Sequence, residues 1–364
     1  MRVLYDNEIF LTQKYGGATR YFYELIKRMP VLKAEVLLYM GKFINEYGLE
    51  EYSKRFTVFS GKKIKHIPRT KLISIKIQKP FFERFADKQE FDILHQTYFA
   101  DINLKKKFKR IITIHDFTHE KLSSNFSSLD KTADLKRLAV EKSDGIICVS
   151  ESTKNDLLER YDTKGKKVKV IYHGNSLRYD VKEEPVIKGK YLLYVGDRRS
   201  YKNFRIIIKL FEINQALRNE YKLICCGGGK FTNEEMEQMT RADVVNNFLQ
   251  IEARDKKIAN LYYFAKAFIY PSKYEGFGIP MIEAMYNGCP IVASNVSSLP
   301  EVGGDSALYF NPDSVDELNG NINTILENEE VVNKLKSLGK EREKIFSWDK
   351  CSDETYKFYK EVME

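Results

Sequence analysis

Cysteine is scarce in this chain, with five residues among 364. No two of them form a C-x-x-C pair, and no group of cysteines and histidines has the spacing of a zinc site. Most lie in apolar, strand-like segments, which predicts buried, reduced thiols in a cytosolic protein. The five are Cys148, Cys225, Cys226, Cys289 and Cys351.

Long hydrophobic runs are also missing. The longest apolar stretches, such as IICV at 146–149 and YLLYV at 191–195, have the length of a strand, so we expect no membrane-spanning helix. The first residues, MRVLYDNEIF, contain no apolar signal core, so we expect no secretory signal. The sequence also lacks solenoid repeats and low-complexity tracts.

Several motifs that bind phosphate or metal are absent. The chain has no G-x-x-x-x-G-K-[ST] segment, which excludes a P-loop ATPase, and no G-x-G-x-x-G opening a helix, which disfavours a nicotinamide cofactor. No D-x-D triplet occurs, which argues against a sugar transferase that binds its diphosphate through a metal. We therefore expect neither metal nor cofactor. No nucleic-acid-binding motif is recognisable, so we expect no nucleic acid partner.

Short apolar segments alternate with helical ones in two successive sets. The length predicts two domains, and the alternation predicts an α/β fold with a doubly wound parallel sheet in each. A charged, proline-containing stretch at 178–190 is typical of a linker. We place Rossmann-like domains at 1–180 and 181–347, with a terminal helix at 348–364.

Expected strands lie at 2–6, 35–40, 92–96, 110–115, 145–150 and 167–173, and then at 191–195, 222–227, 247–251, 267–270, 290–294 and 307–310. Expected helices lie at 18–29, 203–219, 232–242, 255–266, 280–287 and 315–328.

Positive charge is concentrated in the first half. Residues 1–180 carry 35 Lys and Arg against 23 Asp and Glu, whereas residues 181–364 carry 25 against 28. The excess gathers at 61–85 and at 105–110. In 61–85, Leu, Ile and Phe residues are interspersed with lysines, as in an interfacial helix on an anionic membrane. The same apolar residues would equally suit a helix packed on the core, and a basic tract is also typical of a solvated face.

The segment YPSKYEGFGIPMIEAMYN, at 270–287, combines two glutamates with a glycine loop. Glu275 and Glu283 stand eight positions apart, and Pro280 stands where a helix would begin. A helix start offers unpaired N–H groups to an anionic oxygen. We place Glu275 in the loop and Glu283 in the first helical turn, where two acids beside an anion site would suit the hydroxyls of a nucleotide sugar.

Other candidate residues follow predicted strands, at the edge where parallel sheets bind ligands. Gly16 and Gly17 lie between the first strand and a helix beginning at Ala18. His115 ends the strand at 110–115. Arg198 and Lys202 follow the strand at 191–195, where two cations could neutralise a diphosphate.

Six motifs together resemble the family 4 retaining glycosyltransferases of the GT-B fold: YGGATRYFYEL, TIHDFTHE, LYVGDRRSYKNF, CCGGGKFTNEE, YEGFGIPMIEAM and SSLPEVGGDSALYFNP. The resemblance spans nearly the whole chain, and the subgroup most resembled is the bacterial mannosyltransferase-like one of O-antigen, capsule or exopolysaccharide assembly. It implies two Rossmann-like domains facing across a cleft, with the final helix returning to the amino-terminal domain. In one departure, Asp197 stands where the family often has its arginine, so the cation is displaced to Arg198.

The resemblance implies a role for each candidate. Glu275 would bind the donor sugar and Glu283 the ribose, while Arg198 and Lys202 would hold the diphosphate. His115 would lie near the donor sugar and the acceptor. The remaining donor-binding positions would be Gly16, Gly17, Phe277, Gly278 and Ile279.

The sequence thus predicts a metal-independent hexosyltransferase that uses GDP-mannose, or otherwise a UDP-hexose, and a glycan or lipid-linked acceptor in cell-surface polysaccharide synthesis. Such an enzyme would be cytoplasmic, and peripheral at the inner face of the membrane if 61–85 binds lipid. Two alternatives stay open. One is a sugar-nucleotide epimerase of the same fold, and the other is a catalytically silent subunit that binds nucleotide or glycan.

Overall fold

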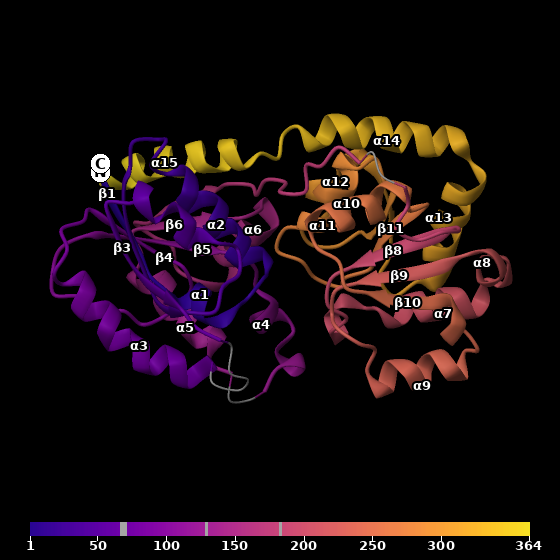
Figure 1. The fold of residues 1–364 in the computed structure, drawn as a ribbon, viewed down its shortest axis with the longest axis horizontal. Coiled ribbons are helices and arrows are strands. Elements are labelled where there is room, and N and C mark those ends of the chain that lie inside the picture. Colours follow the sequence, from indigo (N-terminus) through magenta and orange to yellow (C-terminus); the bar gives the residue numbers. More distant parts are fainter. Residues whose placement is uncertain (66–70, 128–129, 182–183) are drawn as a thin grey trace. The chain divides into compact units, whose positions relative to one another are not determined.

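The computed structural model describes residues 1–65, 71–127, 130–181 and 184–364, with the backbone alone at 71–74. The chain divides into two compact units (Figure 1). Unit 1 comprises Met1–His173 and Trp348–Glu364, and unit 2 comprises Gly174–Ser347. The domain boundary expected between residues 180 and 181 therefore falls inside unit 2.

Unit 1 contains a seven-stranded sheet in the order β3-β2-β1-β4-β5-β6-β7, and every strand pair is parallel. Helices cover both faces of this sheet (Figure 1). Both faces are therefore buried, which explains why every residue of β4 and β6 is buried and why β6 is apolar rather than alternating. The strands are β1 (Arg2–Tyr5), β2 (Glu35–Phe43), β3 (Val58–Lys63), β4 (Ile93–Gln96), β5 (Lys109–Ile114), β6 (Gly145–Cys148) and β7 (Lys167–Val170).

The helices of unit 1 include a short one that the sequence analysis missed. This helix, α1, separates β1 from the glycines at 16 and 17, so these glycines do not follow the first strand directly. The helices are α1 (Glu8–Thr12), α2 (Gly17–Arg28), η1 (Leu49–Arg55), α3 (Lys71–Ala86), α4 (Thr118–Lys121), η2 (Ser123–Asn125), α5 (Thr132–Lys142), α6 (Glu151–Arg160) and α15 (Trp348–Met363).

The carboxyl-terminal helix α15 is built into the core of unit 1. Its Tyr359 hydroxyl lies 2.9 Å from the hydroxyl of Tyr5 and 2.6 Å from Nδ1 of His95. Trp348, at the start of α15, is buried in the same hydrophobic cluster as β1 and α2. Unit 1 is therefore completed by residues from the far end of the chain.

Unit 2 contains a six-stranded sheet in the order β10-β9-β8-β11-β12-β13, again with every pair parallel. Helices again lie on both faces (Figure 1). The predicted α/β class and doubly wound sheets are thus confirmed in each unit. The strands are β8 (Tyr191–Val195), β9 (Lys222–Cys226), β10 (Phe248–Ile251), β11 (Ala267–Tyr270), β12 (Ile291–Ser294) and β13 (Ala307–Phe310).

The helices of unit 2 match most of the expected ones, but the segment expected at 203–219 is divided into α7 and α8. Asn214 ends α7 and its side chain caps α8 by accepting the N–H of Leu217. The helices are η3 (Ser200–Lys202), α7 (Arg205–Ile213), α8 (Gln215–Glu220), α9 (Asn233–Arg241), η4 (Val245–Asn247), α10 (Asp255–Phe264), α11 (Ile279–Tyr286), α12 (Leu299–Gly303), η5 (Gly304–Ser306), α13 (Val315–Glu327) and α14 (Glu329–Glu343).

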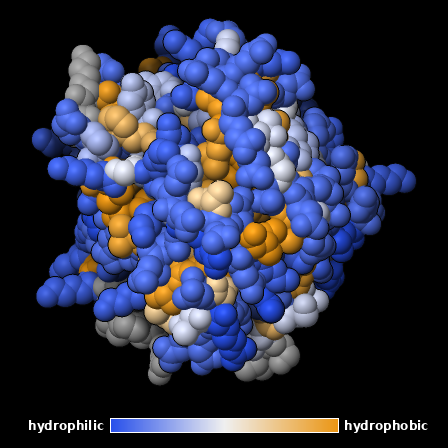
Figure 2. Space-filling view, turned by 90° about the vertical axis from the view of Figure 1, so that its right-hand side faces the viewer, coloured by the Kyte–Doolittle hydropathy of each residue, from blue (hydrophilic) through white to orange (hydrophobic). Residues whose placement is uncertain are grey.

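Hydrophobic residues form no broad patch on the face at the α8 side of the molecule, where small hydrophobic groups are separated by hydrophilic ones (Figure 2). Over the described residues, none of the helices has both the length and the apolar character needed to span a membrane. All five cysteines are buried and none forms a disulfide, which confirms their predicted burial.

Candidate functional site

Four loops of unit 2 meet at one edge of its sheet. They follow β8, β9, β11 and β12, and because these strands are all parallel their carboxyl ends lie at the same edge. This is the edge at which open α/β sheets bind their ligands. The loops after β8 and β11 carry the candidate cations and the first candidate glutamate.

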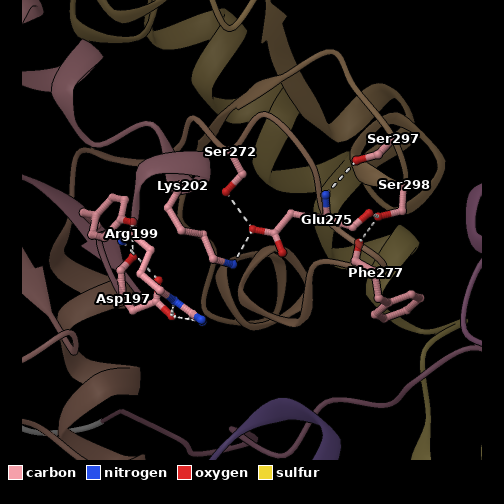
Figure 3. Close-up of polar contacts among 9 residues, drawn as sticks. Asp197, Arg199, Lys202, Ser272, Glu275, Phe277, Ser297 and Ser298 are labelled. Atoms are coloured by element: carbon pink, nitrogen blue, oxygen red, sulfur yellow. Dashed lines mark hydrogen bonds and ion pairs between the residues drawn. The ribbon is translucent and has the colours of Figure 1, made fainter. Parts of the chain in front are cut away.

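Glu275 and Lys202 form an ion pair at this edge. Nζ of Lys202 lies 2.7 Å from Oε1 of Glu275, and the hydroxyl of Ser272 donates to the same oxygen at 2.6 Å (Figure 3). The side chains of Lys202 and Glu275 are only 16% and 12% exposed. Burial alone would lower the pKa of Lys202, but the Glu275 carboxylate raises it above its ordinary value, so the lysine stays charged.

Two serines fix the backbone of the glutamate loop. The N–H of Glu275 donates to the hydroxyl of Ser297 at 2.9 Å. The hydroxyl of Ser298 donates to the carbonyl oxygens of Glu275 at 2.9 Å and Phe277 at 2.8 Å (Figure 3). The loop after β12 therefore holds the loop after β11 in place. The spacing of the serines in the SSLP motif gives no sign of this role, because their partners are more than 20 positions away.

Gly278 caps the amino-terminal end of α11. Its φ of 114° lies in the region that favours glycine, and it caps the helix that begins at Ile279 with Pro280 in the first turn. The ring of Phe277 is buried and packs edge-on against Phe346, with centroids 5.7 Å apart. A ligand at this helix start would therefore meet the backbone of Phe277 rather than its ring.

Glu283 lies deeper in α11 than predicted. The helix begins at Ile279, so Glu283 lies in the second turn and the first turn contains no acid, which corrects the expected first-turn position. Glu283 is buried, and its carboxylate accepts a hydrogen bond from the hydroxyl of Tyr262 at 3.3 Å. A charged group in such surroundings needs this kind of support.

Arg198 does not lie beside Glu275 but faces the loop after β9. Its side chain is 3% exposed and forms an ion pair with Glu235, with Nε 2.8 Å from Oε1. Its guanidinium also donates to the carbonyl oxygens of Gly227, Gly229 and Lys230. The neighbouring Arg199 is paired with Asp197 at 2.6 Å (Figure 3). Arg198 and Lys202, predicted as a pair, thus have different partners in this structure.

The candidate residues of unit 1 lie around the start of α2 and the end of β5. Gly16 caps α2, Gly17 is its first residue, and the N–H of Gly16 donates to the hydroxyl of Tyr47 at 3.3 Å. His115 directly follows β5, and its Nε2 has no hydrogen-bond partner among the described residues. Burial lowers the pKa of His115 to about 4, so the imidazole is neutral at physiological pH.

No group of three or more His, Cys, Asp or Glu side chains with the arrangement of a metal site occurs within the described residues. The groups gathered at the carboxyl edge of unit 2 are instead one lysine, two glutamates and a helix start. Together these can neutralise an anion and accept hydrogen bonds from hydroxyl groups.

Two family models match the chain in succession. The one described as Glycosyltransferase Family 4 matches residues 15–178, and the one described as Glycosyl transferases group 1 matches residues 175–342. All the candidate residues of both units fall within these matches.

Curated relatives include O-antigen chain mannosyltransferase B of Escherichia coli, which is 26% identical over 97% of this chain and 99% of the relative. O-antigen chain mannosyltransferase RfbU of Salmonella typhimurium is 31% identical over 56% of each chain. Both relatives are O-antigen mannosyltransferases, which is the subgroup that the sequence motifs resemble.

Solved structures agree on the fold. Sucrose-phosphate synthase of Thermosynechococcus elongatus has a TM-score of 0.79 at 20% identity, covering 99% of this chain and 98% of that one. WaaG, a glycosyltransferase involved in lipopolysaccharide biosynthesis, has a TM-score of 0.76 at 14% identity, covering 97% and 98%. The chain is therefore a glycosyltransferase of the GT-B fold, with a family 4 domain followed by a group 1 domain.

Proposed function

We propose that this glycosyltransferase transfers a hexose, mannose in the first instance, from a nucleoside diphosphate sugar to a glycan or lipid-linked glycan, with retention of the anomeric configuration. The observation that carries the proposal is the buried pair of Lys202 and Glu275 near the start of α11. The Lys202 ammonium suits a diphosphate, and the Glu275 carboxylate suits sugar hydroxyls. The O-antigen mannosyltransferases among the relatives favour mannose and polysaccharide synthesis.

The nucleotide base is the less constrained part of the donor. GDP-mannose is our first choice because of the mannosyltransferase relatives. A UDP-hexose is the second, since the similar fold of HepE from Anabaena, with a TM-score of 0.74 at 16% identity, was solved with UDP and glucose. The two donors differ in the base, which Lys202 and Glu275 would not contact, and they can also differ in the sugar, whose hydroxyls Glu275 would bind.

In the proposed reaction, the difficult step is departure of the diphosphate from the sugar. Lys202 and the backbone N–H of Ile279, at the start of α11, would stabilise the charge that develops on the leaving group. Removing one such preorganised group typically costs ~3–4 kcal/mol. Glu275 would accept hydrogen bonds from the sugar hydroxyls and Glu283 from the ribose, so that the anomeric carbon is held in place.

We propose attack by the acceptor on the face that the diphosphate leaves, without a carboxylate nucleophile. The departing phosphate oxygen would take the acceptor proton. The neutral imidazole of His115, which directly follows β5, would hydrogen-bond the donor sugar or the acceptor. Gly17, the first residue of α2, would offer its backbone N–H group to the diphosphate, whereas the N–H of Gly16 donates to Tyr47 and the lack of a side chain at Gly16 would allow close approach.

Helix α3 supports the proposal that the enzyme works at an anionic membrane surface. Ile77 and Phe81 are 58% and 59% exposed on this helix, which also carries lysines. Together with Lys62 of β3 they line a cavity of about 370 Å³. Apolar side chains among lysines suit the headgroup region of a membrane, where a lipid-linked acceptor would be found. Residues 66–70 of the predicted tract lie outside the described residues.

The direct test is a panel of sugar nucleotides, with thermal stabilisation and release of nucleoside diphosphate as readouts. A ligand at about 100 times its dissociation constant adds roughly 2.7 kcal/mol of stability. We expect one donor to stabilise the protein and to be turned over when acceptor is present, also in excess EDTA. Loss of activity in EDTA with rescue by Mn²⁺ would refute metal independence, and product formed without any acceptor would favour an epimerase.

A further inference from the structure

The loop after β9 contains three consecutive glycines in an unusual conformation. The φ angles of Gly227, Gly228 and Gly229 are 94°, 71° and 70°, all in the left-handed region that side chains other than glycine rarely adopt. Glycine has no side chain that could fix such a run, so contacts from outside the loop must hold it in place.

Arg198 supplies that support from the loop after β8. Its Nη1 donates to the carbonyl oxygen of Gly227 at 3.0 Å, and its Nη2 donates to those of Gly229 at 3.1 Å and Lys230 at 2.9 Å. One guanidinium therefore binds three carbonyl groups of the loop. Only arginine has a planar fork with enough donors for this task.

Glu235 completes the arrangement from helix α9. Its Oε1 accepts from Nε of Arg198 at 2.8 Å, while its Oε2 accepts from the N–H of Thr232 at 2.7 Å in the capping box of α9. The side chains of Arg198 and Glu235 are 3% and 14% exposed. The glutamate thus links the arginine to the helix that follows the glycine loop.

The glycine loop lies in close contact with the loop after β8. A Cβ atom on Gly228 would lie 2.8 Å from Nη1 of Arg198 and 3.2 Å from Cα of Asp197. A Cβ atom on Gly227 would lie 3.1 Å from the carbonyl oxygen of Gly196. The loop after β8 runs on directly into η3, which contains Lys202.

We propose that Arg198 and Glu235 are positioning residues that clamp the glycine loop to the loop after β8, and so hold the diphosphate end of the donor site in shape. This inference rests on the proposed function, and it gives Arg198 an indirect role. Lys202 meets the charge of the diphosphate, whereas Arg198 acts through the loop. An anion that took Arg198 for itself would leave Glu235 partly buried without its cation, which is costly.

Glu235→Gln separates the clamp from direct contact between Arg198 and the diphosphate. If Arg198 bound the anion directly, removal of the carboxylate would release the guanidinium and binding of the diphosphate would be unchanged or tighter. The clamp predicts the opposite, because the arginine loses a charged partner worth about 1.5–3 kcal/mol, equivalent to about tenfold or more in affinity. Calorimetry would use whichever of GDP and UDP the wild-type protein binds.

Three further variants keep the test decisive. Thr232→Ala removes the cap of α9 without touching Arg198 and should leave nucleotide affinity near wild type. Arg198→Lys keeps the positive charge but loses the planar guanidinium fork. It should bind the nucleoside diphosphate as weakly as Arg198→Ala. Gly228→Ala places a methyl group against the guanidinium, and should weaken binding even if Glu235→Gln folds poorly.

The affinity for the matching nucleoside, guanosine or uridine, distinguishes the clamp from general damage. If Arg198 and Glu235 form a clamp, Glu235→Gln should lose affinity for the nucleoside diphosphate and should bind the nucleoside almost as tightly as the wild type. Equal losses for both, or unchanged diphosphate binding in Glu235→Gln, would overturn the inference. Failure of the wild-type protein to bind GDP or UDP, or an unchanged affinity in Lys202→Ala, would instead refute the proposed function.

Discussion

Lys202 and Glu275, which come from loops after different strands, form an ion pair across 2.7 Å. Each is the group that we propose for a different part of the donor, the diphosphate and the sugar. When a complete donor binds, this ion pair would be replaced by two sets of contacts, between Lys202 and the diphosphate and between Glu275 and the sugar hydroxyls. A bare diphosphate would draw Lys202 away and leave a partly buried carboxylate without its cation, which costs free energy.

Replacement of Lys202 by methionine, which keeps the apolar stem, should weaken binding of the nucleoside diphosphate and lower turnover. The reason is that its charge serves the diphosphate in the bound state and in the transition state alike. We expect a loss of about 100-fold or more in kcat/KM. Lys273→Met is the matched control, because Lys273 lies in the same loop as Glu275 but pairs with Asp313 at 2.6 Å. Equal losses in both variants would contradict a specific role for Lys202.

Tyr262 should support Glu283 in binding the ribose. Tyr262→Phe removes the hydroxyl that donates to the carboxylate and should weaken nucleotide binding slightly, whereas Glu283→Gln should weaken it by about tenfold or more. Tyr191→Phe is the control, since this buried tyrosine donates to the carbonyl oxygen of Leu261 instead. Titration calorimetry would compare the nucleotide affinities of these three variants with that of the wild type. Unchanged affinity in Glu283→Gln would contradict the ribose assignment.

Unit 1 should lose stability as the pH falls below 6.5. Burial lowers the pKa of His95 to about 3, of His115 to about 4 and that of His173 well below its usual range. Between these values and the ordinary pKa of 6.5 the unfolded chain binds more protons, so stability rises with pH through this window and is lost as the pH falls.

The single tryptophan, Trp348, belongs to unit 1 and reports on this unfolding selectively. Urea midpoints from its fluorescence should decrease steadily from pH 6.5 to pH 4.5. In His115→Gln, which cannot gain a proton, the decrease should be smaller. A midpoint that stays constant over this range would show that the three imidazoles do not stay neutral in the folded protein.

Binding to anionic vesicles should depend on α3. Ile77→Ser with Phe81→Ser should reduce co-sedimentation, as should Lys62→Glu with Lys65→Glu, and salt should weaken binding of the wild-type protein. Lys63 is left in place because it already pairs with Glu46 at 3.0 Å. Leu249→Ser is the control, since this leucine is 45% exposed but lies in unit 2. Equal binding by all variants would reject α3 as the contact.

Alternation of strands and helices was sufficient to predict the fold, because strands buried on both faces are largely apolar. The strand that this alternation does not predict is β3, because the second half of its sequence, VFSGKK, is polar and belongs to the basic tract at 61–85. This strand lies at the edge of the sheet, where one side needs no partner strand and the burial is incomplete. A pattern based on hydrophobicity cannot detect it.

The site was predicted less completely, since spacing along the chain identifies residue types but not their partners. Glu275 and Glu283 could be chosen from a single segment. The partner of Arg198, by contrast, is 37 positions away in α9. The sequence analysis placed Arg198 beside Lys202 because they are neighbours in the chain, whereas the fold turns the arginine toward the glycine loop.

The most direct test of the account is Glu275→Gln, with nucleotide affinity and turnover measured on the same preparation. The variant removes the negative charge that competes for Lys202, so we predict that the bare nucleoside diphosphate binds at least as tightly as to the wild type. Turnover should fall by about 100-fold or more, because the sugar hydroxyls lose their charged acceptor. Near-normal turnover, or a clear loss of affinity for the bare diphosphate, would contradict the proposed division of the donor between Lys202 and Glu275.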